Sequence, residues 1–199
     1  MLFGVPLLYG VLGLLHPTVN PEVGDETGLF LGLHVAQLFL IGGLSWMLWL
    51  LVEGLNSRAA TVTRALLLPF IIAYTALDAV LGIAWSVVAA KANELPAADQ
   101  PAAGKLLDEL LDTDPLGLIL YWGAGMLWLA VALAAVTALR RQAPPVALAL
   151  VAIGSVVFVL GHARPMGPIA MALILTGIVW LELRPGQPTA EPVTAVEGG

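Results

Sequence analysis

Residues 65–90, ALLLPFIIAYTALDAVLGIAWSVVAA, form an apolar run long enough to cross a membrane as a helix. A hydrocarbon layer about 30 Å thick needs roughly 20 such residues, at about 1.5 Å of rise each. Asp78 lies near the middle of this run and is the one charged residue in it. A charge at that depth costs about 3 kcal/mol or more unless a partner compensates it. Asp78 is therefore a candidate functional residue.

The composition of the whole chain extends this conclusion. Of 199 residues, 59% are hydrophobic and 11% are charged, and the mean hydropathy is +0.93. These values exclude an ordinary soluble domain and predict an all-α, polytopic transmembrane bundle with the lipid bilayer as its surroundings. Because cysteine is absent, disulfides and thiolate metal sites are excluded. The sequence has no basic patch, so we expect no nucleic-acid partner.

Six predicted spans divide the chain into a transmembrane domain, residues 1–184, and a tail, residues 185–199. The spans are about 1–16, 29–52, 65–90, 116–139, 146–160 and 168–183. The first, fifth and sixth are roughly 23 Å long, less than the hydrocarbon thickness, so longer neighbours must shelter their ends. The tail is rich in Pro, Gly, Thr and Glu, which predicts disorder.

The basic residues predict the orientation of the bundle. One set of alternate loops, together with the start of the tail, contains Arg58, Arg64, Arg140, Arg141 and Arg184, whereas the other set contains Lys91, Lys105 and Arg164. The positive-inside rule then places both termini in the cytoplasm and the protein in the plasma (inner) membrane. The outer loop, residues 91–115, contains a short amphipathic helix at 102–112, with leucines on one face and mostly acidic side chains on the other. We expect this helix to cover the bundle.

Three histidines fall in the outer half of the predicted bundle. His16 ends the first span, His34 lies within two turns of the outer end of the second, and His162 lies in the loop between the last two. Imidazole suits zinc, copper and iron, and three protein ligands are typical of catalytic zinc. The sequence therefore predicts a metal site at His16, His34, His162 and Asp78, holding a divalent metal or a haem. The alternatives are a helix cap or headgroup contact for His16 and His162, and an interhelical hydrogen bond for His34.

Polar residues on two neighbouring spans predict an outward-facing pocket. His34, Gln37 and Ser45 share one sector of the second span, and Tyr74, Asp78 and Trp85 share a face of the third, where Gly82 permits close approach of the helices. Polar stripes of this kind point into a bundle rather than into lipid. The predicted ligand-binding residues are Asp78, His34, Tyr74, Gln37, Trp85 and Arg164, with a solvated loop charge as the alternative for Arg164.

These features predict a membrane protein whose outward-facing polar pocket binds a small ligand or a metal ion. One alternative is a proton-coupled transporter, because an intramembrane carboxyl group with nearby histidines suits a proton relay. Another is a non-enzymatic accessory or scaffold subunit, paired with a partner membrane protein or with copies of itself. The sequence has no complete catalytic signature, so enzymatic activity is left open.

Three segments carry a family resemblance: Gly13–Pro17 (GLLHP), Tyr74–Asp78 (YTALD) and Gly161–Pro168 (GHARPMGP). Their arrangement resembles that of a group of small multi-pass membrane proteins of high-GC bacteria, over about residues 10–183. The resemblance implies a multi-pass fold and carries no activity.

Overall fold

The computed structural model describes residues 2–17, 27–112 and 115–183. Within these ranges the regular structure is entirely helical, which confirms the all-α prediction. The predicted disordered tail at 185–199 lies outside the described residues.

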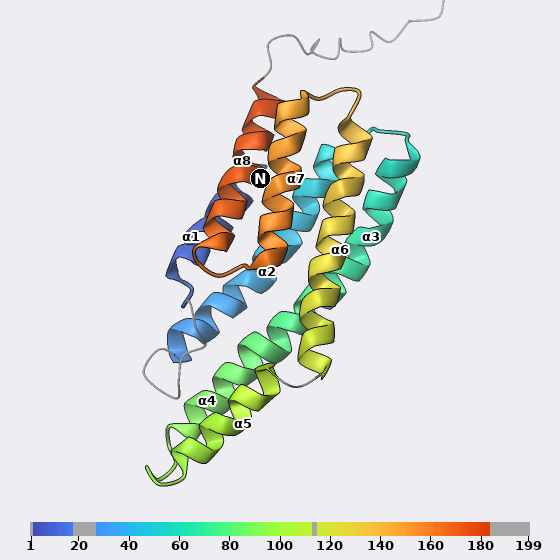
Figure 1. The fold of residues 1–199 in the computed structure, drawn as a ribbon. Helices are drawn as coiled ribbons and strands as arrows, with labels where there is room; N and C mark the ends of the chain where they lie inside the picture. The colour runs from blue at the N-terminus through green and yellow to red at the C-terminus, as the bar shows by residue number, and fades with distance from the viewer. Residues whose placement is uncertain (1, 18–26, 113–114, 184–199) are drawn as a thin grey trace, which may run out of the picture.

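Figure 1 shows the arrangement of the helices. They are α1 (Gly4–Leu15), α2 (Thr27–Leu51), α3 (Arg58–Leu77), the π-helix η1 (Asp78–Ala84), α4 (Trp85–Ala92), α5 (Gln100–Asp112), α6 (Pro115–Leu139), α7 (Pro145–Leu160) and α8 (Met166–Glu182). The predicted amphipathic helix at 102–112 corresponds to α5.

Local sequence explains where several helices begin and end. The residue before a proline disfavours helical backbone, and α1 accordingly stops at His16, which is extended at ψ 128° ahead of Pro17. The hydroxyl of Ser57 accepts a hydrogen bond from the amide of Ala60 at 3.2 Å and caps the start of α3. Pro145 occupies the first turn of α7. Backbone N–H groups in the first turn have no acceptor within the helix, so the proline costs no helical hydrogen bond there.

Three helices are long and apolar enough to cross a membrane: Thr27–Leu51, the continuous helix Arg58–Ala92, and Ile119–Leu139. The remaining apolar helices α1, α7 and α8 contain 12, 16 and 17 residues. At about 1.5 Å per residue they are roughly 18 to 26 Å long, shorter than the hydrocarbon layer. Three of the six predicted spans are thus confirmed as helices of sufficient length and hydropathy to cross a membrane.

The short helices pack together along one part of the long ones. α7 packs against α8 and α6, α1 packs against α8, and α3 packs along α6. α4 and α5 project beyond the ends of α1, α7 and α8, as Figure 1 shows. We call the end where α1 stops and α7 turns into α8 the histidine end; the opposite end contains Arg58, Arg140 and Arg141, and we call it the arginine end.

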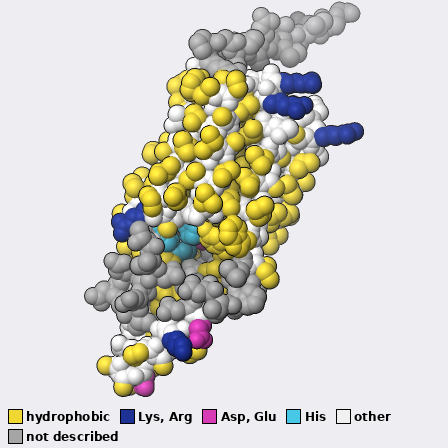
Figure 2. Space-filling model, in the orientation of Figure 1, with side chains coloured by type: hydrophobic (Ala, Val, Ile, Leu, Met, Phe, Trp, Pro, Cys, Tyr) yellow, Lys and Arg dark blue, Asp and Glu magenta, His cyan; other side chains and the backbone are white. Residues whose placement is uncertain are grey.

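Hydrophobic side chains dominate both the interior and the outer surface of the bundle. Ile41, Leu44, Phe70 and Trp128 are at most 1% exposed and fill the core on the arginine side of the histidines. On the outside, Phe39 is 78% exposed and many further apolar side chains face outwards. Figure 2 shows hydrophobic side chains over most of the face between basic side chains at one end and the histidines. This surface suits lipid rather than water.

Two glycines allow α7 and α8 to approach closely. A Cβ at Gly154 of α7 would lie 2.8 Å from the carbonyl oxygen of Ala170, and a Cβ at Gly177 of α8 would lie 2.8 Å from that of Ala147. Small residues at such contacts let two backbones pack directly, which is a principal source of helix association in membranes.

We predict that Gly154→Ala lowers the free energy of unfolding by about 1–3 kcal/mol, because the two backbones must separate. Gly123→Ala on α6 is the matched control, since no atom lies within 4 Å of its Cβ position; it should be neutral or raise the stability by about 0.5–1 kcal/mol. Thermal unfolding of both variants in one detergent measures the difference. Equal melting temperatures would contradict the assigned role of this contact.

Candidate metal centre

The structure brings His16, His34 and His162 together at the histidine end of the bundle. His16 follows the last residue of α1, His34 lies in α2, and His162 lies in the connection between α7 and α8. One ligand nitrogen from each ring can be chosen so that all three lie within 4.8 Å of one another. Because α1 and α7 are short, their ends reach the level of His34, which is inside the longer α2.

The three imidazole rings contact one another edge to face. The ring centroid of His16 lies 5.1 Å from that of His34 and 5.1 Å from that of His162, and the last two are 6.3 Å apart. Nitrogens bound to one tetrahedral metal at about 2.0–2.1 Å would be roughly 3.3 Å apart. Modest rotation of the side chains therefore suffices to place all three nitrogens around a single ion.

Backbone hydrogen bonds orient two of the rings. Nδ1 of His16 is 2.8 Å from the carbonyl oxygen of Pro17, and Nδ1 of His34 is 2.8 Å from that of Phe30. A carbonyl can only accept, so Nδ1 must be the donor in each ring, and in a neutral ring Nε2 then offers a lone pair. Nε2 of His16 is buried and has no hydrogen-bond partner within the described structure. Metal-binding histidines are characteristically held by this kind of bond from the second ring nitrogen.

Aromatic and aliphatic side chains pack against one side of the cluster. The ring of Phe30 lies 4.2 Å from His34, 5.2 Å from His16 and 5.3 Å from Trp85, measured between centroids. Phe30, Trp85 and Ala89 form a small apolar core with Leu107 of α5. α5 thus contributes Leu107 to the apolar group beside the site, whereas Leu106 of the same helix is 69% exposed.

His162 occupies a connection rather than a helix, and burial of its ring changes its protonation. Burial, reinforced by the neighbouring His16 and His34, lowers the pKa of His162 to about 3. The ring is consequently neutral near pH 7, which is the form that coordinates metals. Gly167 permits this arrangement, because the carbonyl group of His162 occupies the space that a Cβ at position 167 would need.

Gly82 of η1 holds His34 in place from the other side. The imidazole of His34 lies where a Cβ at Gly82 would be, so the glycine lets the ring pack directly on the helix backbone. The sequence predicted that Gly82 allows close approach of two helices. The structure shows that the imidazole of His34 fills the space beside this glycine.

Asp78 belongs to a different polar group. It is 2% exposed, at the first position of η1, and the structure does not place its carboxylate with the three histidine nitrogens. It acts electrostatically on Tyr9 and Tyr74, whose hydroxyl oxygens are 2.7 Å apart. Its Oδ2 atom is buried without a hydrogen-bond partner in the described structure. Sequence reasoning missed Tyr9, for which the one signal was a tyrosine inside an apolar span.

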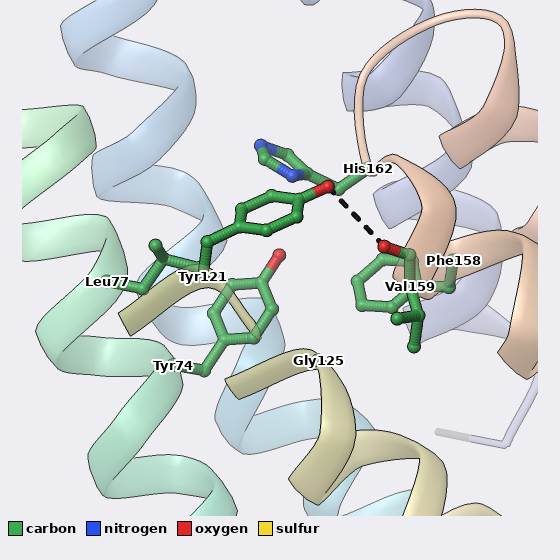
Figure 3. Close-up of a pocket in the computed structure, with 7 residues that line it drawn as sticks. All are labelled: Tyr74, Leu77, Tyr121, Gly125, Phe158, Val159 and His162. Atoms are coloured by element: carbon green, nitrogen blue, oxygen red, sulfur yellow. Dashed lines mark hydrogen bonds between the residues drawn. The ribbon is translucent and has the colours of Figure 1, made fainter. Parts of the chain in front are cut away.

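A cavity of about 10 Å³ separates the cluster from Tyr74. It has room for about one water molecule. Its walls are Tyr74, Leu77, Tyr121, Gly125, Phe158, Val159 and His162 (Figure 3). The hydroxyl group of Tyr121 donates a 3.4 Å hydrogen bond to the carbonyl of Val159.

The other predicted ligand-binding residues do not line this cavity. Gln37 is fully buried, with neither polar atom of its side-chain amide partnered in the described structure, and the indole nitrogen of Trp85 is likewise buried without a partner. Arg164 is exposed. Of the six residues predicted for a ligand pocket, Tyr74 lines the cavity described above.

Comparison of the chain with protein-family models, with curated proteins and with solved structures gives no match.

We predict that Asp78→Asn raises the free energy of unfolding by about 1–3 kcal/mol, because a neutral amide is less costly to bury than an unpaired carboxylate. It should leave metal binding by the histidines unchanged, because Asp78 lies outside the cluster. Glu53→Gln, at an exposed position, is the control and should change stability by less than about 0.5 kcal/mol. A lower melting temperature for Asp78→Asn would mean that the carboxylate has a charged partner that the amide cannot replace.

Proposed function

We propose that the chain is a six-helix plasma-membrane protein that binds one transition-metal ion through His16, His34 and His162 on its extracytoplasmic side. The convergence of three imidazole nitrogens from three separate segments, all within 4.8 Å, is the observation that carries the proposal. Three neutral nitrogen ligands suit zinc, copper, iron or nickel.

The surfaces of the short helices support six membrane spans. Leu7, Leu8, Val11 and Leu14 of α1 are each at least 45% exposed and apolar, which suits lipid contact. α7 and α8 are equally apolar along their length. Local thinning of the bilayer, together with shelter by α2 and α4, accommodates helices of this length.

The distribution of charge supports the orientation. Arg58, Arg140 and Arg141 belong to the arginine end, and the positive-inside rule places such an end in the cytoplasm. The histidine cluster then faces outwards, beneath the projecting α4 and α5.

The geometry favours a single ion over a haem or an organic ligand. The three rings are already in mutual contact, with His16 5.1 Å from each of the others, whereas a porphyrin requires a flat slot between its axial ligands. The cavity next to His162 measures about 10 Å³, far less than the roughly 300 Å³ of a typical small-molecule site.

The surroundings of Asp78 favour binding over proton-coupled transport. A relay across the membrane requires polar groups on both sides of the midplane. On the arginine side of Tyr74, the described core is formed by Ile41, Leu44, Phe70 and Trp128, all at most 1% exposed. The buried polar side chains described on that side include Ser45 and Thr63, and neither of them is titratable.

We predict that the purified protein binds one metal ion per chain, and that His16→Ala, His34→Ala or His162→Ala each lowers the affinity at least about 100-fold. The experiment requires an affinity tag without histidine, because the three histidines of the cluster are all that the chain contains. Zn²⁺, Co²⁺ and Cu⁺ serve as probes, with bound metal measured by elemental analysis after removal of free ion.

Ser45→Ala is the matched control, because Ser45 is also a buried, unpartnered polar residue of α2 but lies three turns from His34. It should bind metal like the wild type. Correctly folded wild-type protein that binds none of the three ions would refute the proposed function, as would binding that survives loss of the histidines.

Gly82→Ala tests the site without removing a ligand. The added methyl group collides with the ring of His34, so we predict a loss of metal affinity of about tenfold or more, in the range seen for groups that orient ligands. Gly32→Ala on α2 has open space at its Cβ position and should have no effect. Unchanged affinity in Gly82→Ala, with the fold intact, would show that metal binding does not use His34 in this position.

A further inference from the structure

The ligand set of the histidine cluster carries no formal charge. Its members are three imidazoles, and no carboxylate of the described residues joins their nitrogens. The second ring nitrogens of His16 and His34 donate to backbone carbonyls rather than to carboxylates. These residues would therefore not neutralise the charge of a bound ion. Only the dipoles of the imidazoles and of the backbone carbonyls would stabilise it.

Among the side chains that the structure describes, no acidic group lies with the cluster to supply a counter-charge. Phe30 and Trp85, each 2% exposed, form an apolar wall beside the rings. The charged residue nearest to His162 in the chain is Arg164, two positions later, which is basic rather than acidic. Asp78, the buried acid of the third span, interacts with Tyr9 and Tyr74 instead.

Such a site discriminates between ions by their charge. The free energy needed to transfer an ion from water into an apolar medium rises with the square of the charge. For a divalent ion this free energy is about four times that of a monovalent ion of the same size. Divalent ions in proteins compensate for this with carboxylate, thiolate or hydroxide ligands. A neutral site beside this apolar wall, without such ligands among the described residues, disfavours a divalent ion relative to a monovalent one.

We propose that the ion held by His16, His34 and His162 is Cu⁺, coordinated by three imidazole nitrogens. This proposal rests on the proposed metal-binding function and specifies its ion. Among the metals that imidazole binds well, copper is the one with an accessible monovalent state. Three nitrogens satisfy Cu⁺ without a fourth ligand, so the charge balance needs no anion from solvent.

The test compares Cu⁺ with Zn²⁺ on the intact protein in lipid nanodiscs, under anaerobic and reducing conditions. A chromogenic Cu⁺ chelator and a Zn²⁺ indicator, each in competition with the protein, give the two affinities. We expect one Cu⁺ per chain, bound at least about 100-fold more tightly than Zn²⁺ because of the charge-dependent cost of burial.

His162→Asp tests the electrostatic cause directly, because it replaces one neutral ligand with a carboxylate in a connection rather than in a helix. Hard oxygen ligands and negative charge favour the divalent ion, so the ratio of Cu⁺ to Zn²⁺ affinity should fall at least about 100-fold. Ser155→Ala on α7 is the control; its hydroxyl bonds within α7, to the carbonyl of Val151, and its removal should leave both affinities unchanged.

The outcomes separate this inference from the function on which it rests. Histidine-dependent Zn²⁺ binding as tight as Cu⁺ binding, or an unchanged ratio in His162→Asp, would overturn the assignment to Cu⁺ and leave the metal site standing. Failure of both ions to bind in a histidine-dependent way would overturn the metal site itself.

Discussion

The difference in length between neighbouring helices is the constraint on which the histidine cluster depends. α2 contains 25 residues and the continuous helix Arg58–Ala92 contains 35, whereas α1 contains 12 and α7 contains 16. The ends of the short helices therefore lie beside the middle turns of the long ones. Irregular backbone at membrane depth is tolerated only when protein shelters it. In the proposed six-span topology α2 provides that shelter, because the rings of His16 and His162 lie against His34.

The bundle keeps two kinds of buried polar group apart. The histidines form a cluster of three imidazoles, in which backbone carbonyls orient His16 and His34 and the open position at Gly82 accommodates His34. Asp78 instead accompanies the hydrogen-bonded pair Tyr9 and Tyr74, at the point where the long helix changes from α to π geometry. π-helical turns occur disproportionately at functional sites. A water-sized cavity lies between His162 of the first group and Tyr74 of the second.

Sequence patterns predicted the coarse architecture well, and their limits have physical causes. Hydropathy identified every apolar helix, because burial in lipid demands long apolar runs. The predicted span boundaries and the distribution of basic residues placed His16, His34 and His162 at the same end of the bundle. The structure brings these three residues together. The grouping of Asp78 with Tyr9 could not be predicted, because it depends on the rotation of α1 about its own axis. The hydrogen bonds from His16 and His34 to the carbonyls of Pro17 and Phe30 could not be predicted either. Every residue has a backbone carbonyl, and only the fold determines which of them accepts a hydrogen bond from a histidine.

X-ray absorption spectroscopy of the metal-loaded protein in lipid nanodiscs tests the central claim most directly. The account predicts three nitrogen neighbours at about 2.0 Å from the metal, with the outer-shell scattering that identifies imidazole rings. A spectrum with fewer than three imidazoles, or with carboxylate oxygens as the main ligands, would contradict the account.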